Sequence, residues 1–341
     1  MTINRHHPII SVVIPAYNTE RTIVDCLTTI HRSSLLPDEI IVVDDGSNDN
    51  TFALAEENGA TVIRLPGNKG RIAARRIGYS RAKGDIIINI DQDVVITEAS
   101  IRIIVEHFMQ NPTCMALTGR LSARSHYKNF FSVYKHLYMH YRFSNLPCSV
   151  HFLYGSIFAL RREVDPTHIP ASLDNGDDTE MGLYLHTQGK EIHFIKDLMV
   201  DHYKYYSFSS LLKNDFLVPM SWTLLALRYV SRVSMKEGRF AHASLSQTLM
   251  IALTVIIFIM SLWAVFGVRG GPVNGIMAIL LVVWFCLNYG LFATMFKHMK
   301  KRYYIAVILF TFIDSLVMAS GMMFGLAKGC ISYLMNNRKF Y

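Results

Sequence analysis

Residues 86–93 read IIINIDQD, a short apolar run that ends in two aspartates. Gly84 and Asp85 precede the run, and its length predicts a buried strand rather than a helix. Asp91 and Asp93 stand two residues apart, so in an extended chain their side chains point to the same side. Two carboxylates at the end of a buried strand are costly without a cation, and Mg²⁺ typically binds one or two carboxylates together with substrate phosphates. We therefore predict a metal and diphosphate site; an acidic pair that faces water is the alternative.

Strands and helices alternate along the chain before this segment. Apolar runs predict strands at 9–14, 40–43 and 61–65, and apolar periodicity predicts helices around 23–30, 51–58 and 71–83. Such alternation indicates an α/β fold with a mostly parallel, doubly wound sheet of the Rossmann type. Ligands of these sheets bind beyond the carboxyl ends of the strands, so the residues that follow each strand are candidates for a site.

Polar residues follow three of the four predicted strands. The first strand leads into Pro15, Ala16, Tyr17, Asn18 and Glu20, the second ends at Asp44, Asp45, Gly46 and Ser47, and the fourth ends at Asp91. Carboxylates can accept hydrogen bonds from a base N–H or from ribose hydroxyls, and a tyrosine ring can cover the face of a base. The same residue types are common in turns. Their recurrence at three strand ends favours a nucleotide-binding pocket over turns alone.

A basic segment opens the helix that precedes residues 86–93. Asn68 and Gly70 lie in the loop before it, and a glycine there permits close approach of the backbone to a ligand. Arg71 and Arg75 are four residues apart on one helix face, from which they can reach a diphosphate. A solvated basic face explains this pattern equally well.

The end of the chain is much more apolar than its first two hundred residues. The 341 residues are 51% hydrophobic and 18% charged, with a mean hydropathy of +0.24. Stretches at about 249–267, 273–296 and 303–327 are long enough to cross a bilayer, and the third contains Asp314. An acid in a span is functional, faces a partner helix or lies near an interface. No apolar segment lies near residue 1, so a cleavable signal peptide is not expected.

Basic residues gather around these apolar stretches, and the net charge is +8. Arg228, Arg232, Lys236 and Arg239 precede the first stretch, Arg269 follows it, and Lys297, Lys300, Lys301 and Arg302 lie between the second and third. The positive-inside rule predicts an integral protein of the plasma (inner) membrane with its N-terminal domain in the cytoplasm. Three basic residues that would then lie outside conflict mildly with the rule: Lys328, Arg338 and Lys339. The basic balance favours anionic lipids and a phosphorylated substrate, with no nucleic acid as a partner.

The motifs PAYN (15–18), VVDDGS (42–47), NKGR (68–71) and DQD (91–93), in this order, resemble the inverting family 2 glycosyltransferases over roughly residues 9–210. The resemblance implies the GT-A fold. It also implies that the first two motifs bind a nucleotide-sugar donor, and that Asp91 and Asp93 hold Mg²⁺ or Mn²⁺ against the sugar diphosphate. Arg76 departs from the family, which often has Asn there, and an altered contact is expected.

Later segments extend the resemblance to the acceptor side. Residues 155–163 are similar to the family's glycine-containing strand and RRE turn, and residues 176–183 to its acidic element at the start of a helix. Asp178 takes the position of the catalytic base, while Asp177 stands where Glu is commoner. Helix N-capping is the alternative for these acids, with Glu180 as a capping-box partner. His202 takes a position close to the metal, with a purely structural histidine as the alternative.

Three domains are expected: a catalytic domain at 1–212, interfacial helices at 213–245, and a membrane anchor with about three spans at 246–341. The aromatic and basic region 126–143 suits a membrane surface, a lipid-linked acceptor or a core-facing helix. Residues 216–229 suggest a second interfacial helix, broken at Pro219. The five cysteines are scattered and indicate neither a disulfide framework nor a zinc site.

The predicted function is transfer of a sugar from a nucleotide-sugar, UDP-linked by family habit, to a hydroxyl of a lipid-linked or glycolipid acceptor in cell-envelope assembly. No QxxRW element follows Asp178, which argues against a chain-extending synthase. Two alternatives remain: transfer to a polyprenyl phosphate, which needs no base, and a non-catalytic nucleotide-binding scaffold. The sequence leaves the oligomeric state undetermined.

Overall fold

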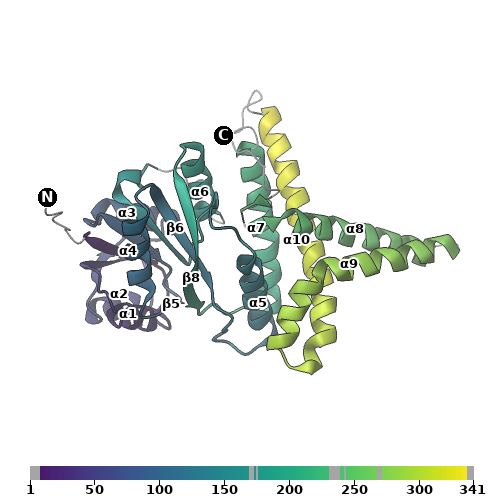
Figure 1. Cartoon of the computed structure of the whole chain (residues 1–341), viewed down its shortest axis with the longest axis horizontal. Helices are drawn as coiled ribbons and strands as arrows, with labels where there is room; N and C mark the ends of the chain where they lie inside the picture. The colour runs from purple at the N-terminus through teal and green to yellow at the C-terminus, as the bar shows by residue number, and fades with distance from the viewer. Residues whose placement is uncertain are drawn as a thin grey trace. The chain divides into compact units, whose positions relative to one another are not determined.

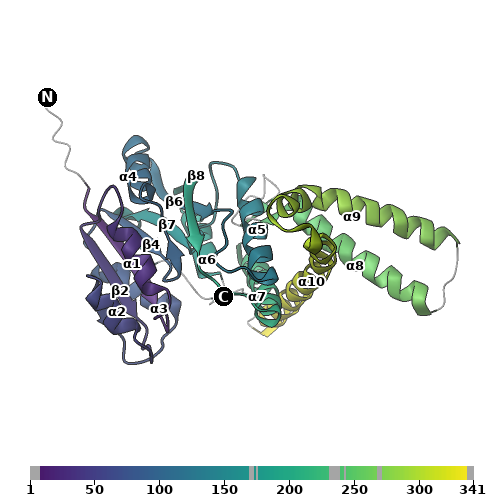
Figure 2. The same cartoon turned by 90° about the horizontal axis from the view of Figure 1, so that it is seen from below.

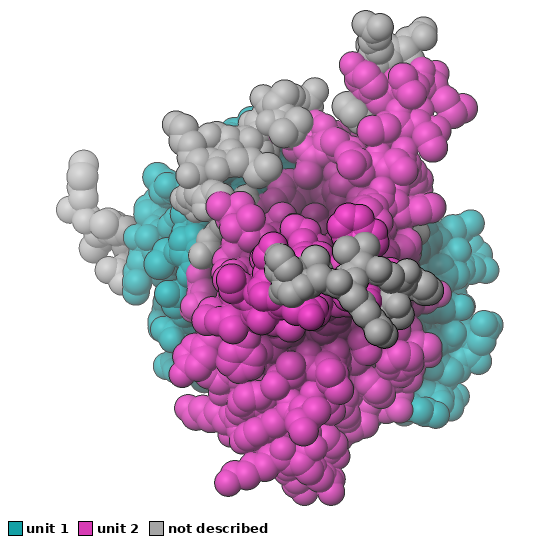
Figure 3. Space-filling view, turned by 90° about the vertical axis from the view of Figure 1, so that its right-hand side faces the viewer, with its two compact units in different colours: residues 1–127, 146–204 teal, residues 128–145, 205–341 magenta. Residues whose placement is uncertain are grey.

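The protein is described here by a computed structural model that covers residues 8–168, 173, 176–229, 239–241, 243–266 and 271–335. The chain divides into two compact units, distinguished by colour in Figure 3. The first unit comprises Met1–Tyr127 and Leu146–Lys204, and the second comprises Lys128–Asn145 and Tyr205–Tyr341. Of the basic residues used above to predict orientation, Arg232, Lys236, Arg269, Arg338 and Lys339 lie outside the described residues.

A mixed sheet forms the centre of the first unit (Figure 1). It has eight strands in the order β3-β2-β1-β4-β7-β6-β8-β5. Its strands are β1 Ile10–Ala16, β2 Glu39–Asp44, β3 Thr61–Arg64, β4 Ile86–Ile90, β5 Val94–Val95, β6 Cys114–Leu121, β7 Ile157–Arg161 and β8 Glu191–His202. The four strands from β3 to β4 are parallel, as are β6 and β8. Strand β7 is antiparallel to β4 and β6, and β5 to β8. The predicted α/β fold is confirmed.

Helices connect these strands, and α1, α2 and α3 lie at nearly the predicted positions. They are α1 Ile23–His31, α2 Thr51–Glu57, α3 Arg71–Arg81, α4 Ser100–Gln110 and α6 Asp177–Thr187, with a 3₁₀ turn at Arg162–Val164. The chain moves outward from β1 through β2 to β3, and α3 then returns it to β4 on the other side of β1. Because such crossovers are right-handed, α3 covers the opposite face of the sheet from α1 and α2. The strand order reverses between β1 and β4, and ligands bind at such a switch point.

The second unit consists mainly of long helices. They are α5 Phe130–Ser144, α7 Phe208–Tyr229, α8 Leu245–Phe266, α9 Gly271–His298 and α10 Tyr304–Met335, with short strands β9 Arg239–Phe240 and β10 Ala243–Ser244 and a 3₁₀ turn at Lys301–Tyr303. Helices α8 and α9 run side by side in both cartoon views (Figures 1 and 2). Among the described residues, three helices are long and apolar enough to cross a membrane, at Leu245–Ala264, Asn274–His298 and Lys301–Met335. Large apolar side chains such as Trp263, Ile279 and Ile305 are exposed on them.

Helix α7 packs along α10 through small residues. A Cβ added at Gly321 would lie 2.2 Å from the backbone oxygen of Phe216, and one at Gly325 would lie 2.6 Å from that of Met220. Glycines four residues apart allow two helices to approach this closely. The predicted break at Pro219 does not occur, because α7 continues through it.

Charged side chains are buried between the helices of the second unit. Lys135 of α5 forms an ion pair with Asp215 of α7. The hydroxyl of Tyr134 donates to Asp314 Oδ2 at 3.3 Å, and Asp314 is 1% exposed. Of the three interpretations of Asp314 left open by the sequence, the structure supports a carboxyl that faces a partner helix.

Candidate active site

The backbone of Gly155, in the loop before β7, contacts Asn89 and Asp178, beside a cluster of three acids (Asp91, Asp177 and Asp178) that we call the acidic cluster. Its N–H donates to Asp178 Oδ2 at 2.7 Å, and its carbonyl accepts from Asn89 Nδ2 at 3.1 Å. A Cβ at Gly155 would lie 3.0 Å from Asp178 Oδ2 and 3.5 Å from Asp91 Oδ2. The carboxylates of Asp91 and Asp178, distant in sequence, therefore face the same small volume.

Arg75 forms ion pairs with two aspartates of this cluster. Its side chain is 2% exposed, its Nη2 bonds Asp91 Oδ1 at 2.7 Å, and its Nη1 bonds Asp177. Arg71 reaches Asp177 as well, at 2.6 Å, with 43% of its side chain exposed. The helix spacing expected for the two arginines is present, and both engage carboxylates of the protein. Arg75 thus links the end of β4 to the start of α6.

The two neighbouring aspartates at the start of α6 ionise differently. Burial opposes ionisation of Asp177, but the charges of Arg75 and Arg71 outweigh it and lower the pKa of that carboxyl. Burial and the charge of Asp177 instead raise the pKa of Asp178. The N-cap of α6 is Gly176 without a side-chain cap, so Asp177 does not act as the cap. The arginines thus hold Asp177 as a carboxylate, whereas Asp178 has the raised pKa that suits a base.

Asp93 pairs with His202 across the short β5–β8 ladder. His202 Nε2 lies 3.0 Å from Asp93 Oδ1. Burial raises the pKa of Asp93, but the charge of His202 and its hydrogen bond lower it more, to about 2. An ionised carboxylate oxygen beside an imidazole nitrogen suits Mn²⁺ or Mg²⁺, which fill their other positions with phosphate and water oxygens. Asp91 forms its ion pair with Arg75 and not with His202.

The predicted nucleotide-binding residues of β2 lie together at its carboxyl end. Asp45 accepts hydrogen bonds from the N–H groups of Lys69 (2.7 Å) and Gly70 (2.8 Å), and so holds the loop before α3. Asp44 Oδ1 accepts from the Ser47 N–H at 3.0 Å. Its Oδ2 is buried without a hydrogen-bond donor among the described residues, although Arg64 Nε lies 3.4 Å away as an ion pair. Asp44 Oδ2 is thus a buried acceptor atom beside the guanidinium of Arg64.

The loop after β1 presents the other predicted contacts. Pro15 and Ala16 are buried at the end of β1, and Tyr17, Asn18 and Glu20 are exposed after it. The N–H of Asn18 donates to Ser47 Oγ at 2.9 Å, which joins the loops after β1 and β2. Glu20 Oε2 accepts from the Asn50 N–H at 3.2 Å, a contact within the protein.

A glycine in the loop after β2 and a side-chain hydrogen bond in the loop before α3 fix the shape of these two loops. Gly46 has a φ of +72°, and a Cβ there would lie 2.6 Å from the backbone of Gly67, so a larger residue would separate the two loops. Asn68 is exposed, and its Oδ1 accepts from the Gly70 N–H at 3.1 Å. The loop that carries Asn68 and Gly70 is thus held against β2 by Asp45 and by close backbone packing.

Sequence reasoning missed the residues that support the cluster. Asn89 is fully buried, bonded by the Tyr79 hydroxyl at 3.0 Å and donating to the Gly155 carbonyl. In the sequence, a single amide side chain within an apolar strand was the feature that could have indicated this role of Asn89. The similarity of residues 155–163 to the family's glycine-containing strand pointed to Gly155, but its contacts with Asn89 and Asp178 depend on the approach of β7, β4 and α6. Gln92, between the two aspartates, accepts the Tyr17 N–H at 2.8 Å.

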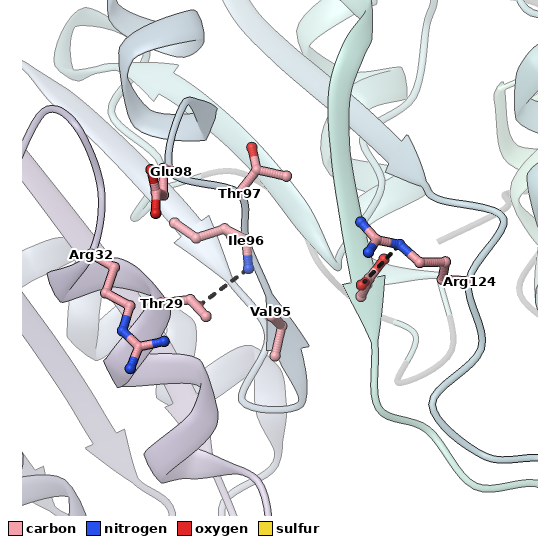
Figure 4. Close-up of a pocket in the computed structure, with 8 residues that line it drawn as sticks. Thr29, Arg32, Val95, Ile96, Thr97, Glu98 and Arg124 are labelled. Carbon is pink, nitrogen blue, oxygen red and sulfur yellow. Dashed lines mark hydrogen bonds and ion pairs between the residues drawn. The ribbon is translucent and has the colours of Figure 1, made fainter.

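A cavity of about 300 Å³ lies beside β5 (Figure 4). Its lining residues are Thr29, Arg32, Val95, Ile96, Thr97, Glu98, Arg124 and Asp201. The close-up shows Arg32 on one side and Arg124 on the other, with Arg124 Nε 3.8 Å from Asp201. Asp201 and His202 are adjacent on β8, so their side chains point to opposite faces. The cavity therefore neighbours the Asp93–His202 pair without containing it.

Comparison with known proteins agrees with this geometry. Residues 11–168 match the family model described as Glycosyl transferase family 2. Glycosyltransferase GlyG of Streptococcus pneumoniae serotype 4 is 33% identical over 107 residues, 30% of this chain and 36% of that protein. The poly-beta-1,6-N-acetyl-D-glucosamine synthase of Staphylococcus aureus is 28% identical over 120 residues, 34% of this chain and 29% of that protein. The chain thus spans about a third of the length of these curated relatives.

Among solved structures, the mannosyltransferase PcManGT from Pyrobaculum calidifontis, in complex with GDP-Man and Mn²⁺, has a similar fold. The TM-score is 0.53 at 15% identity, over 96% of this chain and 88% of that one. The strand-end cluster, the family match and the shared fold agree with one another: this chain carries a glycosyltransferase family 2 domain with the GT-A fold, followed by three candidate membrane-spanning helices.

Proposed function

We propose that this chain is a membrane-anchored, metal-dependent, inverting glycosyltransferase. It moves a sugar from a nucleotide-sugar, with UDP favoured, to a hydroxyl of a lipid-linked or glycolipid acceptor at the cytoplasmic face. The observation that carries the proposal is the convergence of Asp178 Oδ2 and Asp91 Oδ2 within 3.5 Å of one point beside Gly155. A base and a donor-side acid need this proximity if one reaction takes place between them.

Asp178 is assigned the role of general base. In an inverting transfer the acceptor hydroxyl attacks C1 of the sugar as the bond to the nucleotide diphosphate breaks. The hydroxyl proton passes to a carboxylate within hydrogen-bond reach. The N–H groups of Gly155 and Thr179 each donate to Asp178 at 2.7 Å and fix its orientation. Its raised pKa makes it a stronger base than an ordinary carboxylate.

The donor side is assigned to the other carboxylates. Asp93 and His202 would hold Mg²⁺ or Mn²⁺, which would stabilise the charge that develops on the leaving diphosphate. Arg71, the more exposed of the two arginines, is assigned to the diphosphate, while Arg75 holds Asp91 and Asp177 in place. Asp44 Oδ2 accepts from the base or ribose. PcManGT carries both a nucleotide-sugar and Mn²⁺, so this combination is the first to test.

Membrane anchoring is supported by the three apolar helices. The cytoplasmic placement of the first unit, in the plasma membrane, is proposed from the basic residues Lys297, Lys300, Lys301 and Arg302 between the second and third spans. Protease treatment of intact cells and of inside-out vesicles distinguishes the two orientations. Cleavage of the first unit in intact cells, from outside, would contradict the cytoplasmic placement.

Replacement of Asp178 tests the base. Asp178→Asn keeps the shape of the side chain and removes the proton acceptor, so transfer should fall about 10²- to 10⁴-fold with donor affinity retained. Asp197→Asn, at an exposed position of β8, is the matched control. Undiminished turnover of Asp178→Asn would remove the assignment and favour a polyprenyl phosphate acceptor, which is already an anion.

A donor panel tests the broader proposal. UDP- and GDP-linked sugars are incubated with the full chain, Mn²⁺ or Mg²⁺ and extracted membrane lipids, and products are identified by mass spectrometry. Metal-dependent formation of a glycosylated lipid is the expected result. If no donor is transferred or hydrolysed with either metal, the non-catalytic scaffold becomes the better explanation of the fold.

A further inference from the structure

Two histidines and a cysteine converge at the amino-terminal ends of β6 and β8. His107 lies in the last turn of α4, Cys114 begins β6, and His193 lies near the start of β8. His107 Nε2 and His193 Nδ1 are 2.8 Å apart, and one ring nitrogen of each histidine lies within 4.8 Å of Cys114 Sγ. Three elements that are separate in sequence thus direct one nitrogen or sulfur donor each to the same place.

The chemistry of these donors selects a class of metal. Imidazole and thiolate together bind Zn²⁺ and related borderline ions, whereas Mg²⁺ and Ca²⁺ require oxygen ligands. Zinc bonds of about 2.0–2.3 Å place the donors around one ion about 3–4 Å apart. The observed separations bracket that value, so side-chain adjustments on the order of 1 Å would complete the geometry. Cys114 is buried and forms no disulfide, and its thiol donates to the Ala116 carbonyl at 3.1 Å, a contact that metal binding would replace.

The carboxylate of Glu191 lies near His193, on the side of the ring away from His107. Glu191 Oε2 lies 3.7 Å from His193 Nε2, the ring nitrogen that does not face His107. The hydroxyl of Thr113 donates to the same Glu191 oxygen at 2.6 Å and fixes it. Histidines that bind metals typically place their second nitrogen against a carboxylate, which sets the tautomer and strengthens the ligand. This support is a second, independent feature of a metal site.

We propose that His107 Nε2, Cys114 Sγ and His193 Nδ1 bind one Zn²⁺, with a water as fourth ligand and Glu191 as the outer partner of His193. The ion ties α4 to the sheet. His202 follows His193 by nine positions along β8, about 25–30 Å along a strand, so this site is separate from the proposed catalytic metal. Because the site is remote from the Asp93–His202 pair, we assign it to stabilisation of the catalytic domain and not to transfer.

Cobalt titration tests the site on the full chain. After chelation, one equivalent of Co²⁺ should give a thiolate-to-cobalt charge-transfer band, and Zn²⁺ should displace it and raise the melting temperature of the first unit. Cys114→Ser should abolish the band, whereas Cys148→Ser, which changes an exposed free cysteine, should keep it. His202→Ala should also keep it, which separates this site from the catalytic metal. Glu191→Gln should weaken Co²⁺ binding about 10- to 100-fold.

Several outcomes would overturn the proposal. If chelated wild-type protein shows no thiolate band at equimolar Co²⁺, His107 and His193 form only a hydrogen-bonded pair. A band that survives His107→Gln and His193→Gln would place the metal elsewhere. The wild-type titration does not depend on whether a variant folds, so the proposal stays testable even if Cys114→Ser is unstable.

Discussion

The N–H of Gly155 donates to Oδ2 of Asp178 at 2.7 Å, and the missing side chain of Gly155 leaves the space that Asp178 and Asp91 both face. A methyl group in this position would approach Asp178 Oδ2 and Arg75 Nη2 to 3.0 Å each. The proposed base and the buried arginine therefore depend on a glycine that makes no side-chain contact of its own.

Gly155→Ala should lower kcat/KM for transfer about 10- to 100-fold, because displacement of a base by less than 1 Å is enough for losses of this size. Initial rates with a saturating acceptor measure the effect. Gly275→Ala is the control, since a Cβ there meets nothing within 4 Å. A rate for Gly155→Ala within twofold of the wild type would contradict the proposed crowding.

The pH dependence of transfer should report the raised pKa of Asp178. The deprotonated carboxylate acts as the base, so activity is lost as pH falls through this pKa. Burial and the charge of Asp177 raise the pKa of Asp178. The acidic limb of the pH–rate profile should therefore lie above the pKa of an ordinary aspartate, about 3.9. Asp177→Asn removes the neighbouring charge and should move the limb of kcat/KM to lower pH. A limb that does not move in Asp177→Asn would indicate another titrating group.

Arg75→Met should destabilise the first unit by about 3–5 kcal/mol, because it leaves the buried carboxylate of Asp177 with only one arginine and removes the Asp91 contact. All three tryptophans, Trp222, Trp263 and Trp284, belong to the second unit. Hydrogen exchange of β4 and α6 is therefore the appropriate measurement.

Arg81→Met, at an exposed position of the same helix, provides the control for Arg75→Met and should change stability by less than about 0.5 kcal/mol. Equal exchange rates in Arg75→Met and the wild type would mean that the buried ion pairs contribute nothing net to stability.

Gly321→Ala should destabilise the second unit by about 1–3 kcal/mol. The added methyl group would meet the backbone of Phe216, which cannot move aside without shifting α7. Tryptophan fluorescence during unfolding reports this unit specifically. Gly275→Ala serves again as the control, because it adds the same methyl group to open space. Equal unfolding midpoints for Gly321→Ala and Gly275→Ala would show that α7 and α10 tolerate a wider separation.

Local patterns in the sequence determined the catalytic fold. Continuous apolar runs located β1, β2, β3 and β4, and period-3.6 apolar spacing located their helices, to within about two residues, because burial of a strand or of a helix face imposes these patterns directly. The motif at 176–183 located the start of α6 through its resemblance to the family's acidic element. Long apolar runs likewise predicted the three candidate spans that the structure contains.

Contacts between distant elements were decided only by the tertiary structure. Asp177 and Arg75 are 102 residues apart, and no local pattern shows that a buried arginine would join Asp177 to Asp91. Residues 128–145 belong with helices that begin after residue 205, although they interrupt the catalytic unit in sequence. The cysteines gave no zinc pattern, because His107, Cys114 and His193 meet only where α4, β6 and β8 pack. Periodicity records which face of an element is buried, whereas the partner of that face depends on the whole fold.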